Sequence, residues 1–279
     1  MIIKPAFFTI DIEDYYHIIG VRGTPDITSW DQLPSRVEYS LDRLLDLLAE
    51  HNVTASLFFL GYIAKRYPHL VKKAMSQGHE IASHGMYHTE VCTQSQSDFF
   101  AEALQSRMLL EDICGEAVIG YRGAGFSIDH RNPWFFESLL QAGYLYDSSL
   151  VPNRLHHRLI PGVQLYPSKI QTNSGSICEF PIGMAEMAGM KLNMFGGGYL
   201  RFFPKPLLIH MAHRTLMKRP LLVYIHPREM DPDHPRISMN LYRYFKSYVN
   251  MKSVPGKLEA LLQITEYQRL KDYYETHNS

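Results

Sequence analysis

Two histidines lie four residues apart in residues 83–88, whose sequence is SHGMYH. Imidazoles at this spacing reach one cation if the chain makes a helical turn there. Far upstream, the carboxylates of Asp11, Glu13 and Asp14 follow an apolar, β-prone run. Because carboxylates at a strand end can complete a two-histidine site, the sequence predicts a metal centre. Taken alone, the histidines could equally be a surface or core pair, and the acidic residues a solvated loop or a helix cap.

Other polar residues stand where predicted strands end. Arg122 ends the fourth strand, Asp147 the fifth and His226 the last. The carboxyl ends of parallel strands in an α/β barrel meet on one face, where enzymes of this architecture place their active sites. We therefore expect these residues to be neighbours. Arg122 could instead form a structural ion pair with Asp147, and His226 could be an ordinary buried histidine.

Short apolar runs alternate with longer amphipathic ones, which is typical of an α/β fold with a parallel sheet. About seven strands with helices between them predict a parallel (β/α) barrel. The strands are predicted at residues 7–12, 54–60, 79–82, 118–122, 144–147, 177–181 and 221–226, and the helices at 36–50, 63–77, 97–114, 133–141 and 205–217.

We expect a single domain over residues 1–279, with residues 239–279 as a peripheral helical extension. Residues 239–277 predict two helices packed on the outside and broken at Pro255 and Gly256. Residues 152–176, with several prolines, glycines and polar residues, predict a long loop that could contact a substrate.

Composition narrows the class of protein. The chain has 279 residues, 46% of them hydrophobic and 20% charged, and no formal net charge. This balance gives no global field for nucleic acid or an anionic bilayer, so we expect no nucleic-acid partner. The start lacks the pattern of a cleaved signal, and no apolar run is long enough to span a bilayer, which favours a cytoplasmic protein. The three cysteines are widely spaced and are expected to be reduced.

Several motifs resemble, in order, those of the NodB-homology polysaccharide deacetylases of carbohydrate esterase family 4. The resemblance spans residues 7 to about 235, and residues 35–38 and 196–199 look like a branch found near exopolysaccharide and exosortase loci. That branch is similar in outline to an unusual peptidoglycan deacetylase and to metal-independent allantoinases. The motifs are TIDIED at 9–14, SHGMYH at 83–88, GYR at 120–122, YDSS at 146–149 and YIHP at 224–227.

The resemblance implies a distorted (β/α) barrel of about seven parallel strands. It also implies metal-dependent removal of acetyl groups from N-acetylated sugars of a polysaccharide or its lipid-linked precursor. His84 and His88 would hold a divalent metal, with Zn²⁺ expected because it lowers the pKa of bound water towards about 7. Asp11 would act as the general base, Arg122 would keep it ionised, and His226 would protonate the leaving amine. Association with polysaccharide synthesis machinery at a membrane surface is also expected of such a protein.

The chain departs from the family pattern in three places. The family has two adjacent aspartates, the base and then a ligand, but Ile12 follows Asp11 here, so the ligand is Glu13 or Asp14. Glu13 is slightly favoured because it shares a strand face with Asp11. Glycine and alanine follow Arg122 in place of an Ala-Pro pair. Tyr224 replaces the leucine expected near the pocket for the acetyl methyl group.

Asp147, Tyr199 and Tyr224 are the candidate substrate-binding residues, although aromatic residues at such spacings are more often core. The glycines at 196–198 allow either a tight turn or the close approach of a sugar. Two rival functions stay open. One is an allantoinase-like amidohydrolase of small amides, which metal content would distinguish. The other is a non-catalytic carbohydrate-binding protein of an export complex, which would tolerate Asp11→Asn.

Overall fold

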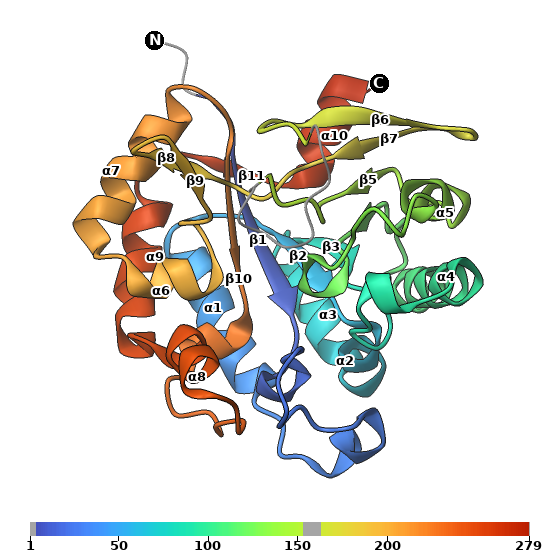
Figure 1. Cartoon of the computed structure of the whole chain (residues 1–279), viewed down its shortest axis with the longest axis horizontal. Coiled ribbons are helices and arrows are strands. Elements are labelled where there is room, and N and C mark those ends of the chain that lie inside the picture. The colour runs from blue at the N-terminus through green and yellow to red at the C-terminus, as the bar shows by residue number, and fades with distance from the viewer. Residues whose placement is uncertain (1–3, 153–162, 279) are drawn as a thin grey trace.

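The structure is a computed structural model that describes residues 4–152 and 163–278. A curled, mostly parallel sheet dominates it, with strand order β10-β1-β2-β3-β4-β5-β7-β6 and β11 added beside β1 (Figure 1). All seven predicted strands are confirmed and run parallel. They are β1 (Ala6–Ile12), β2 (Ser56–Phe59), β3 (Glu80–Ser83), β4 (Gly120–Tyr121), β5 (Tyr146–Asp147), β7 (Gly175–Glu179) and β10 (Leu221–Ile225).

The remaining strands were not predicted. β6 (Ser168–Thr172) pairs antiparallel with β7, inside the region expected to be an irregular loop. β8 (Ala185–Met187) and β9 (Met190–Leu192) form a separate hairpin, and β11 is Tyr267–Gln268. Residues 153–162 of the predicted loop lie outside the described residues.

The helices lie mainly around the outside of the sheet (Figure 1). The predicted helix at 63–77 is in fact two, because Pro68 lacks an N–H group and disfavours helical backbone at Tyr67. The helices are α1 (Val37–Glu50), α2 (Gly61–Arg66), α3 (Pro68–Ser76), α4 (Gln96–Cys114), α5 (Phe135–Gln141), α6 (Gly197–Phe202), α7 (Lys205–Leu216), α8 (Leu241–Tyr248), α9 (Val254–Leu262) and α10 (Leu270–Asn278).

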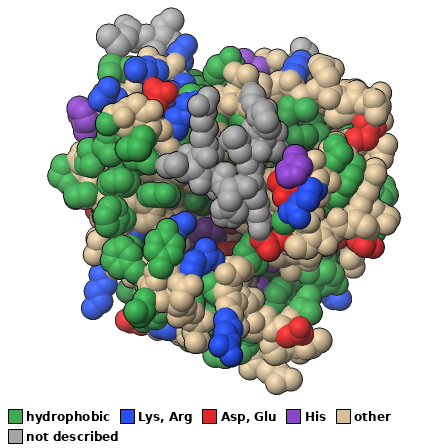
Figure 2. All heavy atoms as spheres, viewed as in Figure 1, with side chains coloured by type: hydrophobic (Ala, Val, Ile, Leu, Met, Phe, Trp, Pro, Cys, Tyr) green, Lys and Arg blue, Asp and Glu red, His purple; other side chains and the backbone are tan. Residues whose placement is uncertain are grey.

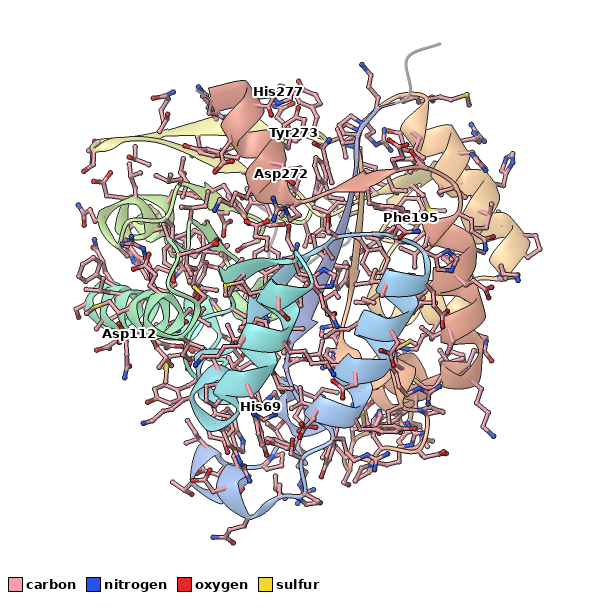
Figure 3. The ribbon with its side chains drawn as sticks, turned by 180° about the vertical axis from the view of Figure 1, so that it is seen from behind. His69, Asp112, Phe195, Asp272, Tyr273 and His277 are labelled. Carbon is pink, nitrogen blue, oxygen red and sulfur yellow. The ribbon has the colours of Figure 1, made fainter. Side chains whose placement is uncertain are left out.

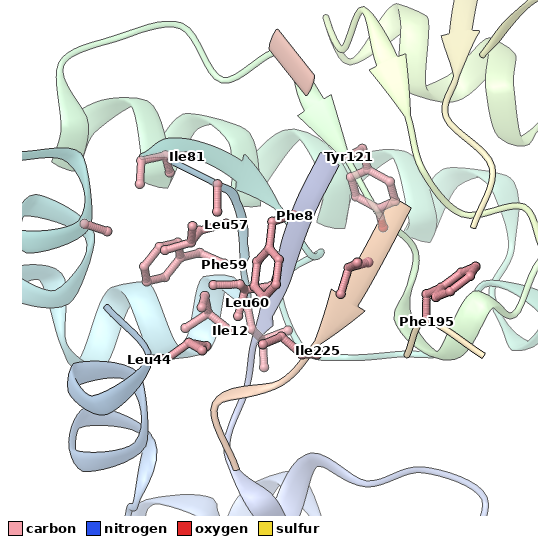
Figure 4. Close-up of a cluster of buried hydrophobic side chains, with 14 of the residues drawn as sticks. Phe8, Ile12, Leu44, Leu57, Phe59, Leu60, Ile81, Tyr121, Phe195 and Ile225 are labelled. Atoms are coloured by element: carbon pink, nitrogen blue, oxygen red, sulfur yellow. The ribbon is translucent and has the colours of Figure 1, made fainter. Parts of the chain in front are cut away.

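Strand alternation divides β1 between two environments. Phe8, Ile10 and Ile12 pack with α1 and neighbouring helices in the main core, several of whose side chains Figure 4 shows. Phe7 belongs to a second buried cluster on the opposite, concave face, together with Tyr146 and Leu222. Because successive side chains point to opposite faces, Thr9, Asp11 and the following Glu13 continue the concave face towards the carboxyl end of the strand.

The sequence predicted that the C-terminal segment packs on the outside. In the structure, parts of this segment instead join the sheet and a buried cluster. β11 pairs with β1, and Leu270 of α10 is buried in the concave cluster. Tyr273, labelled on α10 in Figure 3, packs its ring edge-on against Phe7 with 5.3 Å between centroids. The predicted break at Pro255 is also wrong, because this proline occupies the first turn of α9, where its missing N–H costs no hydrogen bond.

Within residues 4–152 and 163–278, no helix combines the length and apolar character needed to cross a membrane.

Candidate functional site

Six of the sequence-predicted residues line one pocket of about 180 Å³ at the carboxyl ends of the strands. They are Asp11, Glu13, His84, His88, Tyr224 and His226. Figure 2 shows this side of the molecule, with a hollow near its centre beside basic, acidic and histidine side chains. The residues meet there because each follows the concave-facing positions of its strand.

Asp11 is held by a fully buried arginine. Arg122 Nη1 lies 2.7 Å from Asp11 Oδ1 and also donates to the hydroxyl of Thr9 at 3.0 Å. The rest of the guanidinium donates to the main-chain and side-chain oxygens of Ser148 and lies 4.0 Å above the ring of Phe58. These contacts fix the arginine despite the glycine-rich turn that follows it. Sequence reasoning missed Thr9, although it shares a strand face with Asp11.

Glu13 lies between two imidazoles. Its Oε2 is 2.8 Å from His88 Nε2, and its Oε1 is 3.6 Å from His226 Nε2. One ligand atom from each of Glu13, His84 and His88 lies within 4.8 Å of the other two. Among the described residues, Glu13 Oε2 has no partner besides His88 Nε2, and the buried His88 Nδ1 has no hydrogen-bond partner. Buried polar atoms normally have partners, so this donor set fits a divalent cation.

His84 has the ring orientation that a metal ligand needs. Its Nδ1 lies 2.7 Å from the carbonyl oxygen of Arg122. A proton on Nδ1 that donates to this oxygen leaves the Nε2 lone pair free. Burial lowers the pKa of His84 to about 4, against the opposing effect of Asp11. The imidazole is therefore neutral at pH 7.

The histidines come together without the helical turn that their spacing was expected to require. His84 and His88 are instead brought to 5.1 Å between ring centroids by left-handed backbone at Gly85 and His88. Glu102 of α4 fixes this loop, because its Oε1 accepts from the backbone N–H groups of Met86 and Tyr87 at 3.0 Å each. Glu102 carried no signal in the sequence beyond its place in a predicted helix.

Both pocket carboxylates stay ionised at neutral pH. Burial raises the pKa of Asp11, but the neighbouring charge of Arg122 leads the effects that outweigh burial and leave the pKa below its ordinary value. Burial likewise raises the pKa of Glu13, but His88 and His226 hold it well below the usual range. An ionised Asp11 can accept a proton, and an ionised Glu13 can bind a cation.

Asp14 does not lie with the other candidate ligands. Its Oδ1 accepts from the N–H of Tyr15 at 2.8 Å, and its Oδ2 accepts from the Ser35 hydroxyl at 2.6 Å and from the N–H of Arg36 at 2.9 Å. Val37, the first residue of α1, also donates to Oδ2. The carboxylate thus caps two helical segments, and the structure favours Glu13 over Asp14 as the ligand.

Asp147 is also outside the pocket lining. It follows Tyr146, whose side chain is in the concave cluster, so the alternation of the strand turns Asp147 to the other face. There it accepts from the N–H and hydroxyl of Ser149 and pairs in register with Glu179 of β7. Asp147 thus lies away from the pocket in which it was expected to contact substrate, and among the described residues Arg122 pairs with Asp11 and not with Asp147.

This buried carboxyl pair predicts a dependence of stability on pH. Burial raises the pKa of Asp147 to about 6, and burial together with Asp147 raises that of Glu179 well above its ordinary value. The folded protein binds the protons of these two carboxyl groups more tightly than the unfolded chain does. Their contribution to the free energy of unfolding is therefore fully present below about pH 4 and is lost as pH rises through 6. Glu179→Gln should be more stable than the wild type at pH 8, by on the order of 2 kcal/mol, but not at pH 4.

Urea unfolding at the two pH values measures this difference. Glu259→Gln, an exposed change in α9, is the matched control and should follow the wild type. If the free energy of unfolding of Glu179→Gln depends on pH as that of the wild type does, the raised pKa values assigned to this carboxyl pair are wrong.

The two tyrosines predicted to bind substrate differ in position. Tyr224 lines the pocket, where its ring packs edge-on against Phe126. Tyr199 is half-buried in α6 and outside the pocket lining, with Lys246 Nζ 5.8 Å from its ring centroid. A Cβ at Gly196 would lie 2.0 Å from the Tyr224 ring, so this glycine permits protein packing there rather than the approach of a sugar.

Comparisons with known proteins agree with this geometry. Residues 27–143 match the polysaccharide deacetylase family, and residues 148–275 match a domain family of unknown function, DUF3473. A chitooligosaccharide deacetylase of Sinorhizobium fredii is 34% identical over 118 residues, 41% of this chain and 54% of the relative. A peptidoglycan-N-acetylglucosamine deacetylase of Bacillus cereus is 30% identical over 102 residues, 37% of this chain and 46% of the relative. The chain thus spans about half the length of these curated relatives.

Solved structures share the fold. A candidate polysaccharide deacetylase of Mycobacterium smegmatis superposes with a TM-score of 0.66 at 18% identity, covering 98% of this chain and 90% of that one. The PuuE allantoinase superposes with a TM-score of 0.65 at 15% identity, covering 99% and 91%. At these identities the likeness supports the fold alone.

Proposed function

We propose that this chain, whose residues 27–143 match the polysaccharide deacetylase family, hydrolyses the N-acetyl group of an amino sugar in a polysaccharide or its precursor. One observation carries the proposal. The ion pair of Arg122 with Asp11 lies beside the Glu13, His84 and His88 donor set in a single pocket. A carboxylate held ionised next to a cation site suits the activation of water for amide hydrolysis.

We propose that Glu13, His84 and His88 hold a divalent metal, and that this metal is Zn²⁺. One carboxylate and two imidazoles form a ligand set known from catalytic zinc sites, which keep a further position open for water or substrate. When bound, the metal supplies Lewis-acid polarisation of the acetyl carbonyl and a more acidic water.

The protein's own residues would move the protons. Asp11 accepts a proton from the attacking water, and Arg122 keeps it charged and aimed into the pocket. His226, whose Nε2 lies 3.9 Å from Asp11 Oδ2, donates a proton to the departing sugar amine. Its side chain is 15% exposed and lines the pocket, so the ring can be reached from the pocket.

Removal of the metal should abolish the activity. We expect the purified protein to release acetate from N-acetylglucosamine oligomers, to lose this activity on treatment with a chelator, and to regain it with Zn²⁺. Acetate assay with metal analysis measures this. Activity that survives complete chelation would favour the allantoinase-like alternative, and no acetate from any N-acetylated sugar would favour the non-catalytic one.

The cytoplasmic location and the association with polysaccharide synthesis machinery stay predictions. The exposed apolar side chains of α8, with Leu241 89% and Tyr242 73% exposed, offer a surface for such an association.

A further inference from the structure

The pocket has a basic wall that the deacetylation chemistry does not use. Arg201, Arg228, Arg243 and Lys246 all line it, and all four lie in the second matched segment, residues 148–275. Arg201 is buried and paired with Glu229. In the part of the chain that the structure describes, the other three form no ion pair with a carboxylate. We call Arg228, Arg243 and Lys246 the basic rim.

The basic rim is held in place by uncharged contacts. Arg243 Nη2 donates to the carbonyl oxygen of Ile19 at 2.7 Å. The Nε of Arg243 is buried and has no partner among the described residues. Arg228 Nη1 is buried and likewise without a partner in residues 4–152 and 163–278. The Lys246 stem lies against Gly198, where a Cβ would come within 2.9 Å of Lys246 Cγ. Arg243 and Lys246 are therefore held in place, and donor atoms of Arg228 and Arg243 stay without partners among the described residues.

The carboxylates of the pocket offset the charges of the basic rim only in part. Asp11 is already paired with Arg122, and Glu13 contacts His88, although the charge of Arg228 also reaches Glu13 and helps to lower its pKa. Burial, and then the positive charges of Arg243 and Arg201, lower the pKa of Lys246, so these cations repel one another. Clustered cations without counter-ions cost stability unless they bind an anion, and such a cluster beside a cleft attracts anionic ligands.

We infer that the natural substrate carries a carboxylate or phosphate on, or next to, the acetamido sugar, and that the basic rim binds this anion. The inference rests on the proposed function and specifies its substrate class. Arginine forks bind the planar oxygens of carboxylates and phosphates in pairs, and lysine adds a point charge. A neutral chitin-type chain leaves these donors unpaired and binds less well.

Binding to the metal-free protein tests the inference without catalysis. Calorimetric titrations compare chitotetraose with a tetrasaccharide that alternates glucuronic acid and N-acetylglucosamine, and N-acetylglucosamine with its 1-phosphate. We expect at least one anionic ligand to bind about tenfold or more tightly than its neutral counterpart, since hydrogen bonds to charged groups contribute at this scale. The pair that shows the preference identifies the anion as carboxylate or phosphate. Equal or tighter binding of both neutral ligands would overturn the inference.

Variants locate the effect. The double change Arg228→Gln with Lys246→Gln should remove the preference, whereas Lys252→Gln, an exposed lysine outside the pocket lining, should keep it. Lys246→Gln alone, at an exposed position, should weaken the preference even if the double variant does not fold. A preference that survives in folded variants would contradict the role of the basic rim.

The two proposals fail differently. Acetate released equally well from neutral and anionic oligomers would contradict the anionic substrate class but support the deacetylase. Tight anion binding without acetate release from any ligand, with metal present, would support the basic rim and contradict the deacetylase.

Discussion

Asp11→Asn is expected to lower the rate of acetate release about 10²- to 10⁴-fold, the contribution typical of a general base. The asparagine keeps an oxygen that can accept from Arg122, whose Nη1 now lies 2.7 Å from Asp11 Oδ1. It cannot take a proton from water. Because Asp11 is outside the Glu13, His84 and His88 donor set, the metal content should stay close to that of the wild type. Acetate release and metal stoichiometry, measured on the same preparation, check both statements.

A second buried carboxylate provides the control. Asp147 also ends a strand, but on the opposite face, so Asp147→Asn should retain most of the activity. Asp11→Asn also leaves the buried charge of Arg122 without its counter-ion, which is destabilising. Circular dichroism at the assay temperature must therefore show that the variant is folded. If the Asp11→Asn variant is folded, binds metal and keeps near wild-type activity, Asp11 is not the general base.

The strand pattern of the sequence was enough to place most of the site. Alternation along β1 put Asp11 and Glu13 on one face, and the parallel order brought Arg122 and His226 to the same end of the sheet. Both inferences use only local periodicity and the geometry of parallel strands. The confirmed seven strands show why this worked, since every candidate in the pocket lies in a strand that the sequence predicted or in the segment that follows one.

Other features depend on contacts that no local pattern encodes. The turn that joins His84 to His88 is set by Glu102, which reaches it from α4. Asp147 was misplaced because β5 has only two residues, and a shift of one residue turns a side chain to the other face. The basic rim gathers residues from α8 and from the turn after β10, elements that only the folded chain brings together.

Substitutions at Glu13 and Asp14 should have different effects, the first on metal binding and the second on stability. Glu13→Gln is expected to weaken Zn²⁺ binding by more than the roughly 10- to 100-fold that loss of an outer-shell partner costs, because a ligand carboxylate itself is lost. Asp14→Ala should leave the affinity nearly unchanged and lower the free energy of unfolding by about 1–3 kcal/mol, because the N–H groups of Tyr15 and Arg36 lose their acceptor. Competition with a chromophoric chelator measures the affinity.

Urea unfolding of the chelator-treated protein measures the stability, so that bound metal contributes nothing to it. Adjacent acidic residues then serve as controls for each other, since both are buried and both carry one charge. If Asp14→Ala loses the metal and Glu13→Gln keeps it, the ligand has been assigned to the wrong carboxylate. If both variants lose the metal, the Asp14 carboxylate also positions the neighbouring Glu13. It could do so because its hydrogen bonds with the N–H groups of Arg36 and Val37 tie the end of β1 to the start of α1.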